Sequence, residues 1–368
     1  MELWEKELLQ RMPVHIVQSV LKHKKRGTWI SFAQNCSDGG VMLPRDWGGN
    51  KLQSEELESW LYTWISTQYS DNISPDGILL CSSLESAWRQ LLDHYVEPDD
   101  DVWAVHPLSA ELIRLLKERE VNIIGIESSV SLLSLTEQYD LKAPACIVLS
   151  GSVEEKWGQE EGIGQFIVSQ GIKVFVDQTN SFQRCSCGHS SNVYHIHSLQ
   201  KLWFPDISIA WITGEVSQLT QQGRGRDSNS HKQGQIAAQR LHYIVSDPLF
   251  SWHTHTLQIE DIYRARYQLM SALLETSVWS QCIADVSMVQ KDGIYIWIPL
   301  QEELKARHVL RASLLQGVDF WISNDWSSGQ SGQYEWIRLN YAAYPEAILK
   351  KGISILQEVL GDFTARLG

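Results

Sequence analysis

Short apolar runs alternate with amphipathic segments through the first two thirds of the chain. Six runs have the length of buried strands: Gly77–Cys81, Val102–Val105, Asn122–Ile126, Ala145–Leu149, Lys173–Val176 and Ile207–Ile212. Between them, helices are expected at Leu84–Tyr95, Ala110–Glu118 and Glu161–Gln170. Such alternation is typical of a parallel or mixed sheet with helices on both faces, so the pattern predicts an α/β domain.

The last third of the chain has a different pattern. Gln221–Gln233 is polar and predicts a loop, and a long helical region, Gly234–Glu275, follows it. Strands are then expected at Gly293–Pro299 and Glu335–Tyr341, and helices at Gln301–Gln316 and Pro345–Leu360. This part predicts a compact second lobe of α+β type.

Three domains are therefore expected. Residues 1–30 would form an N-terminal helical arm, in which Met1–Arg26 is one helix with a basic end. Residues 31–255 would form a large α/β domain, and residues 256–368 a small C-terminal α+β domain.

Composition narrows the class of protein. The 368 residues are 43% hydrophobic, enough for a large core in two lobes. The formal net charge of −13 argues against nucleic acid as a partner, because nucleic-acid binding normally needs a basic face. No apolar run approaches the roughly 20 residues that span a bilayer, and no secretory signal is visible, so the prediction is a cytoplasmic protein without a membrane partner. The six cysteines are too dispersed for a disulfide framework.

The segment Tyr194–Gly214, YHIHSLQKLWFPDISIAWITG, places one lysine in a Ser-x-x-Lys context ahead of an apolar run. It resembles the cofactor-lysine segment of fold-type I aminotransferases of class I and II, which depend on pyridoxal phosphate (PLP). In that family, Ser-x-x-Lys-x-x-x-Pro-x-x-Arg-x-Gly holds the lysine that forms a Schiff base with PLP. Ser198, Lys201 and Pro205 are in register with this motif, whereas Ser208 stands at the arginine position.

The resemblance extends over most of the chain from about residue 31. Pro98–Pro107 is similar to a proline-bounded strand of the family, and Ile259–Glu275 is similar to the helix that opens its small domain, especially in the MocR-type branch. Gly293–Pro299, Gln316–Ile322 and Ile337–Ala342 resemble strands of that domain in the same order. The resemblance implies an aspartate-aminotransferase-like fold and a homodimer.

Two residues match the positions that carry the family's central chemistry. The resemblance implies that Lys201 forms the Schiff base and that Asp177 pairs with the pyridine nitrogen of PLP, which keeps the ring protonated as an electron sink. Asn180 stands where the family has a tyrosine near the cofactor. Taken singly, a lysine is usually solvated and an aspartate after a strand usually belongs to a turn or cap.

The phosphate would be bound by hydroxyls and a helix N-terminus. By resemblance, Ser82 and Ser83 form the turn before the helix at Leu84, and Ser198 adds a third hydroxyl. The alternative for the first two serines is an ordinary helix cap. Ser208 in place of arginine removes a bidentate contact worth about 1.5–3 kcal/mol.

The resemblance also suggests the ligand. Arg338 matches the arginine that binds the substrate carboxylate, which implies an amino acid or keto acid. A surface ion pair is the alternative role for this residue.

Two functions stay open. The first is an aminotransferase that works through Lys201. The second is a non-catalytic relative that senses a ligand or binds a protein, because Ser109 replaces the stacking tyrosine and residues 150–158 offer no asparagine for the cofactor. MocR-type proteins join such a domain to a winged-helix DNA reader, for which the 30 residues before the domain are too few. Whether the chain is an enzyme is left undecided.

A metal site is the competing interpretation of one segment. Cys185, Cys187, His189, His195 and His197 are types of residue that bind zinc. Their spacing matches no zinc-finger pattern, so a turn between two strands is preferred and no metal is expected.

Overall fold

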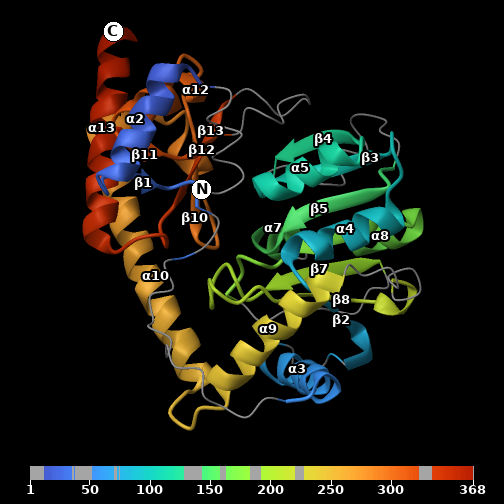
Figure 1. Ribbon diagram of the computed structural model, residues 1–368. Helices are drawn as coiled ribbons and strands as arrows, with labels where there is room; N and C mark the ends of the chain where they lie inside the picture. The colour runs from blue at the N-terminus through green and yellow to red at the C-terminus, as the bar shows by residue number, and fades with distance from the viewer. Residues whose placement is uncertain are drawn as a thin grey trace. The chain divides into compact units, whose positions relative to one another are not determined.

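The computed structural model describes residues 12–34, 37, 52–69, 73, 75–127, 143–157, 163–182, 192–219, 228–322 and 334–367. The chain divides into two compact units (Figure 1). The large unit contains Gly39–Asp261 and Trp326–Ser331. The small unit contains Met1–Asp38, Ile262–Asp325 and Gly332–Gly368.

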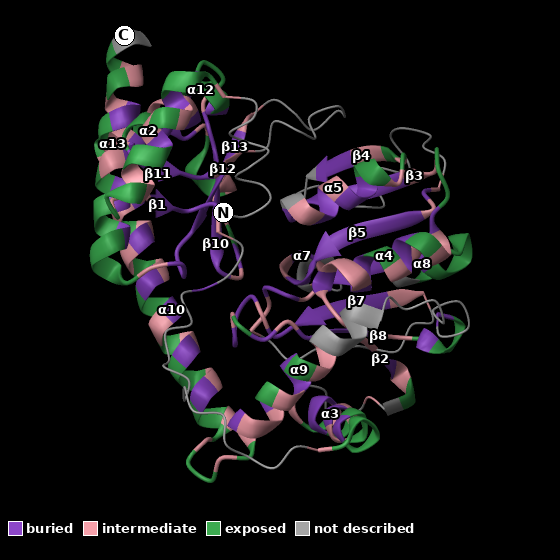
Figure 2. Ribbon diagram, viewed as in Figure 1, coloured by how far each residue is buried: buried purple, intermediate pink, exposed green. Residues whose placement is uncertain are grey.

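A seven-stranded sheet organises the described part of the large unit. Its order is β2 (Ile78–Cys81), β8 (Ala210–Thr213), β7 (Val193–Ser198), β6 (Lys173–Asp177), β5 (Cys146–Ser150), β3 (Asp101–His106) and β4 (Asn122–Glu127). β8 runs antiparallel to both of its neighbours, and the other strand pairs are parallel. The central strands are buried on both faces (Figure 2), which is why they are continuous apolar runs in the sequence.

Helices lie before, between and after the strands of this sheet along the chain. They are α3 (Ser54–Tyr69), α4 (Leu84–Tyr95), α5 (Ala110–Glu118), α7 (Gly151–Trp157), α8 (Ile163–Gln170) and α9 (Ser228–Val245), with short 3-10 turns at Pro75–Gly77 and Val216–Gln218. α4 is an amphipathic helix: Leu84, Trp88 and Leu91 are buried at helical spacing, while Arg89 faces solvent. The mixed sheet with its helices confirms the predicted α/β class.

The small unit contains a four-stranded antiparallel sheet in the order β12 (Trp321–Ile322), β13 (Trp336–Asn340), β10 (Tyr295–Pro299) and β9 (Gln290–Asp292). A separate parallel pair joins β1 (Ile30–Ser31) to β11 (Val318–Asp319). The helices are α2 (Val14–Lys25), α11 (Ser277–Cys282), α12 (Ala306–Leu315) and α13 (Glu346–Leu367), with a 3-10 turn at Val286–Met288. α10 (Trp252–Leu274) begins in the large unit and ends in the small one.

The N-terminal residues lie elsewhere than expected. Residues 12–34 were assigned to a separate arm and to the start of the large domain, but they belong to the small unit. The cause is physical: α2 packs on α12, and β1 pairs with β11 through bonds such as Ile30 N to Gly317 O at 2.9 Å. The expected helix Met1–Arg26 is described only from residue 12, and its regular part is α2.

Three other element predictions need correction. The run Ile207–Ile212 becomes a strand only at Ala210, because the N–H groups of Ile207 and Ile209 donate to the nearby carbonyls of Phe204 and Ile207 instead of to a neighbouring strand. The expected loop Gln221–Gln233 is helical from Ser228, and residues 221–227 lie outside the described residues. The helical region Gly234–Glu275 is two helices, interrupted at Ser246–Ser251 by a segment that contains Pro248.

Candidate functional site

Three side chains form a hydrogen-bonded chain at the ends of β6 and β7. Asp177, the last residue of β6, is 3% exposed, and Lys201 is 5% exposed. The Lys201 Nζ donates to the Thr179 Oγ1 at 2.7 Å, and the Thr179 hydroxyl donates in turn to the Asp177 Oδ1. The backbone N–H of Thr179 also donates to that oxygen at 3.0 Å, and the Asp177 Oδ2 lies 3.8 Å from the Lys201 Nζ.

Parallel strand pairing brings these residues together. β6 and β7 are neighbours with Asp177 opposite Ile196, so their carboxyl ends lie side by side. Lys201 follows the end of β7 by three residues, in a turn where Trp203 and Phe204 bond back to the carbonyl of Leu199. A buried ammonium is stable only with polar partners, which Thr179 and Asp177 supply. We call Asp177, Thr179 and Lys201 the lysine cluster.

Asn180 lies next to this cluster in sequence and is 6% exposed. Its side-chain Oδ1 is buried and accepts no hydrogen bond from the described residues. A buried carbonyl without a donor costs about 1–3 kcal/mol, so this oxygen needs a partner such as a water or a ligand.

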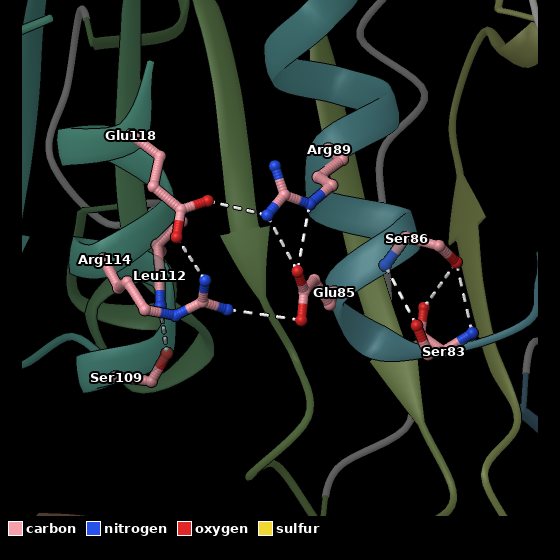
Figure 3. A network of polar contacts seen from close by, with 8 residues as sticks. All are labelled: Ser83, Glu85, Ser86, Arg89, Ser109, Leu112, Arg114 and Glu118. Carbon is pink, nitrogen blue, oxygen red and sulfur yellow. Dashed lines mark hydrogen bonds and ion pairs between the residues drawn. The ribbon is translucent and has the colours of Figure 1, made fainter. Parts of the chain in front are cut away.

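The serines of the expected phosphate site have partners within the chain. Ser83 caps α4: its Oγ accepts from the Ser86 N–H at 3.1 Å, and its own N–H donates to the Ser86 Oγ at 3.1 Å (Figure 3). The Ser82 hydroxyl donates to the Ser86 Oγ at 3.3 Å. The Ser198 Oγ accepts from the Gln200 N–H at 3.2 Å. The cap, which was the open alternative for Ser83, is therefore present.

Ser109, at the position of the family's stacking tyrosine, is likewise a helix cap. Its Oγ accepts from the Leu112 N–H at 3.3 Å at the start of α5 (Figure 3). Glu111 follows in the first turn of α5. Burial raises the pKa of the Glu111 carboxyl, with the positive charge of Lys201 acting against this rise and the negative charge of Asp177 adding to it. Glu111 thus lies within electrostatic range of the lysine cluster.

Arg338 occupies the middle of β13 in the small unit and is 1% exposed. Trp297 and Trp321 are its partners on the two neighbouring strands. The guanidinium carbon lies 5.7 and 5.4 Å from the ring centroids of these tryptophans and 4.2 Å from that of Tyr295. The Nη2 donates to the carbonyl of Ala33 at 3.3 Å. Burial lowers the pKa of Arg338, and electrostatic interaction with Tyr295 and Asp292 acts against this shift.

The surface ion pair that remained as the alternative for Arg338 is therefore wrong, because the guanidinium is enclosed by aromatic rings. It belongs to the small unit, whereas the lysine cluster belongs to the large unit.

The histidines of the competing metal segment have other contacts. The His195 Nε2 lies 2.6 Å from the Glu154 Oε1, and His197 stacks on Trp211 at 5.2 Å between ring centroids. Burial lowers the pKa of His197 to about 3, so its imidazole is neutral. Among the described residues no group of three or more metal-binding side chains is arranged around an ion site, and Cys185, Cys187 and His189 lie outside them.

Comparisons with known proteins identify the fold. No family model and no curated protein matches the sequence. Solved structures do match: alpha-aminoadipate aminotransferase from Thermus thermophilus, with 16% identity over 97% of each chain and a TM-score of 0.68, and kynurenine aminotransferase from Pyrococcus horikoshii, with 16% identity over 96% of each chain and a TM-score of 0.66. An archaeal alanine:glyoxylate aminotransferase also matches, with 15% identity over 95% of each chain and a TM-score of 0.69. The chain has an aspartate-aminotransferase-like α/β fold.

Within this fold, the Lys201 Nζ lies 3.8 Å from the Asp177 Oδ2, and Asn180 follows Thr179 in sequence, while the roles of these residues toward PLP stay predictions. Thr179 and Glu111 are the additional residues that sequence reasoning missed. Thr179 sits between two expected site residues in Asp-Gln-Thr-Asn, and Glu111 follows Ser109 by two positions.

No helix in the described part of the chain is long and apolar enough to cross a membrane.

Proposed function

We propose that this chain is a PLP-dependent, aminotransferase-like protein that acts on an amino acid or keto acid through Lys201. The observation that carries the proposal is the lysine cluster, a buried amine and a buried carboxylate joined by one hydroxyl. It lies at the carboxyl ends of adjacent parallel strands, where open α/β sheets bind their ligands.

The residues present fit the ring end of PLP. The Asp177 carboxylate would pair with the pyridine nitrogen, and the Lys201 amine would bind the aldehyde carbon. The buried Oδ1 of Asn180 offers an acceptor that no described residue satisfies. At the phosphate end, Ser82, Ser198 and the N-terminal N–H groups of α4 would be the donors. When bound, the cofactor would supply an electron sink for bond cleavage at the α-carbon of an amino acid.

The chain's own residues have three tasks in this proposal. Asp177 would keep a proton on the ring nitrogen, and Lys201 would accept a proton from the substrate α-carbon. Thr179 accepts from the Lys201 Nζ and donates to the Asp177 Oδ1, so it would hold the amine and the carboxylate in position. In the small unit, Arg338 would bind the carboxylate of the amino acid or keto acid. By resemblance we further propose a cytoplasmic homodimer.

A second candidate function rests on the caps. Ser83 and Ser109 use their hydroxyls to begin α4 and α5, and Ser208 has no guanidinium for a phosphate. These observations favour a non-catalytic relative that binds an amino acid or keto acid, or a protein, with weak PLP affinity or none.

An absorbance titration of the purified protein with PLP separates the two candidates. We expect a new visible band from covalent attachment at Lys201, absent in Lys201→Ala and retained in Lys117→Ala, which removes an exposed lysine of α5. Borohydride reduction should then fix the adduct on the Lys201 peptide in a mass spectrum. A wild type that stays spectrally unchanged under excess PLP would contradict the first candidate and support the second.

The phosphate position has its own test. If the phosphate lies where the resemblance implies, Ser208→Arg should tighten PLP binding about tenfold or more, because a guanidinium adds a charge-assisted bidentate contact. Ser217→Arg, which places the same charge at an exposed position of the large unit, is the matched control. Equal effects of the two variants would show that the gain comes from net charge alone.

A further inference from the structure

A polar network lies next to the lysine cluster, on the opposite face of the seven-stranded sheet. Consecutive residues of a strand point to opposite faces, and directly paired residues of neighbouring strands share a face. His195 is paired with Val176, which packs with Val153 of α7 in one buried apolar cluster. His195 therefore lies on the face that α7 covers, whereas Asp177, the residue after Val176, points to the other face.

Glu154, in α7, is the centre of this network. Its Oε1 lies 2.6 Å from the His195 Nε2, and its Oε2 accepts from the Gln178 Nε2 at 2.8 Å. A carboxylate only accepts hydrogen bonds, so the His195 Nε2 carries the hydrogen that they share. His195 is 3% exposed and the Glu154 side chain 33% exposed. One carboxylate thus joins α7 to β7 and to the residue that follows β6.

Gln178 connects this network to the lysine cluster, because it lies between Asp177 and Thr179 in the chain. Its backbone N–H donates to the carbonyl of Ile196 in β7 at 2.9 Å. Its side-chain amide lies against Gly151, the first residue of α7. A Cβ atom at this glycine would be 2.5 Å from the Gln178 Oε1 and 2.9 Å from its Cδ. The glycine therefore leaves the space in which the amide reaches the carboxylate of α7.

Gln178 is bound through both its backbone and its side chain, so the segment with two members of the lysine cluster is fixed at its middle residue. Functional groups must be held within roughly 0.5 Å of their working geometry. We propose that Glu154 is a positioning residue, which binds the Gln178 amide and thereby keeps Asp177 in contact with Lys201. His195 orients the Glu154 carboxylate for this task. The consequence for PLP binding rests on the proposed function, whereas the contact between Asp177 and Lys201 does not.

The coupling energy between Asp177 and Lys201 tests this role without PLP. Asp177→Ala, Lys201→Met and the double variant are unfolded in urea beside their parent, and the same cycle is repeated in a Glu154→Ala background. We expect the coupling energy to fall to less than half in that background. A residue that only stabilised α7 would lower the stability of all four proteins equally and leave the coupling energy unchanged. A coupling energy that is unchanged, or already absent in the parent cycle, overturns the proposal.

Gly151→Ala disturbs the same contact from another element and removes no hydrogen-bonding group. Its methyl group would displace the Gln178 amide, the flexible end of a side chain, so the variant should fold. We expect the coupling energy to fall as it does in Glu154→Ala. Should proteins of the Glu154→Ala cycle fail to fold, the Gly151→Ala cycle decides. Glu55→Gln, which removes an exposed carboxylate from α3, is the control. An equal fall in this control would show that net charge sets the coupling energy, and the proposal would be wrong.

A PLP titration separates this proposal from the proposed function. If PLP gives a visible band with the wild type, Glu154→Ala and Gly151→Ala should weaken its binding, whereas Glu55→Gln should not. If PLP gives no band with the wild type and the coupling energy still falls, the proposed function fails and the positioning role of Glu154 stands. If the band forms and PLP binds all four proteins equally tightly, Glu154 does not position the lysine cluster and the proposal is overturned.

Discussion

Lys201 and Arg338 are two buried cations, and the two units of the molecule stabilise them in different ways. The ammonium of Lys201, in the large unit, lies between the Thr179 hydroxyl and the Asp177 carboxylate. The guanidinium of Arg338, in the small unit, lies among Tyr295 and two tryptophans and donates to a backbone carbonyl. The first cation has oxygen partners, and the second lies against aromatic faces in addition to its carbonyl partner.

The difference follows from the chemistry of the two groups. An ammonium is compact and strongly hydrated, so its burial requires oxygen partners, whereas a guanidinium is planar, weakly hydrated and stacks on rings. A lysine between a hydroxyl and a carboxylate can exchange a proton with its neighbours. An arginine keeps its charge. Here the aromatic rings around Arg338 also make it part of the packed core. Of the two, Lys201 is the residue suited to proton transfer, and we expect Arg338 to contribute more to stability.

The largest effect is expected at Arg338. Arg338→Ala should lower the free energy of unfolding by about 3–5 kcal/mol, because it leaves a cavity among large rings and a carbonyl without its donor. Arg338→Lys should recover part of this, since an ammonium cannot stack on all three rings. Urea unfolding measures both, with Arg307→Ala, which changes an exposed side chain of α12, as the control. If the two alanine variants cost the same, the ring contacts contribute nothing.

A somewhat smaller effect is expected at Asp177. Asp177→Ala leaves the ammonium of Lys201 buried without its carboxylate, which should cost about 3 kcal/mol. In a Lys201→Met background the same change should cost at least about 1 kcal/mol less, because no buried charge then remains. Urea unfolding of the four proteins gives the coupling energy. Additive losses would mean that the 3.8 Å separation carries no interaction.

The ends of β3, β5 and β6 could be predicted from the sequence to within a residue or two, because each apolar run is bounded by polar residues. β7 was missed as a strand because His195 and His197 interrupt its apolar pattern. Both are buried, one beside Glu154 and the other on Trp211. Such contacts arise between distant segments, so no local pattern reports them.

In the candidate site, too, some features could be predicted from the sequence and others, which depend on contacts between distant segments, could not. Lys201 and Asp177 could be paired from their family order, whereas the bridge through Thr179 could not, because a hydroxyl between two buried charges has no sequence signal. The rings around Arg338 come from β10 and β12, which are paired through β13 only in the folded chain.

Thr179 offers a smaller and sharper test of the lysine cluster. Thr179→Val keeps the shape of the side chain and removes the hydroxyl that joins the other two residues, so it should cost about 1–2 kcal/mol. Thr179→Ser keeps the hydroxyl and should cost less than half of that. Thermal or urea unfolding compares them. Equal losses would show that the methyl group, and not the hydrogen bond, is what matters at this position.

The smallest effect is expected where charges are exposed. Glu85, Arg89, Arg114 and Glu118 form a ring of alternating charges between α4 and α5, in which each arginine contacts both glutamates (Figure 3). Their side chains are 30% to 46% exposed. Exposed ion pairs contribute about 0–1 kcal/mol to stability. The loss on breaking this ring is therefore a reference value with which the losses at the two buried cations can be compared.

Arg89→Ala should therefore cost only a few tenths of a kcal/mol near pH 7, and less in molar salt. The hydrogen bond from Arg89, followed by that from Arg114, lowers the pKa of Glu118 from its ordinary value of 4.5. Because the folded-state pKa is the lower one, the stabilisation is present above that value and is lost as the pH falls through the folded pKa. Urea unfolding of wild type and Arg89→Ala should thus differ near pH 7 and converge near pH 3. A difference that persists in acid and in high salt would mean that the aliphatic stem of Arg89 packs on α5, and that its charge contributes nothing.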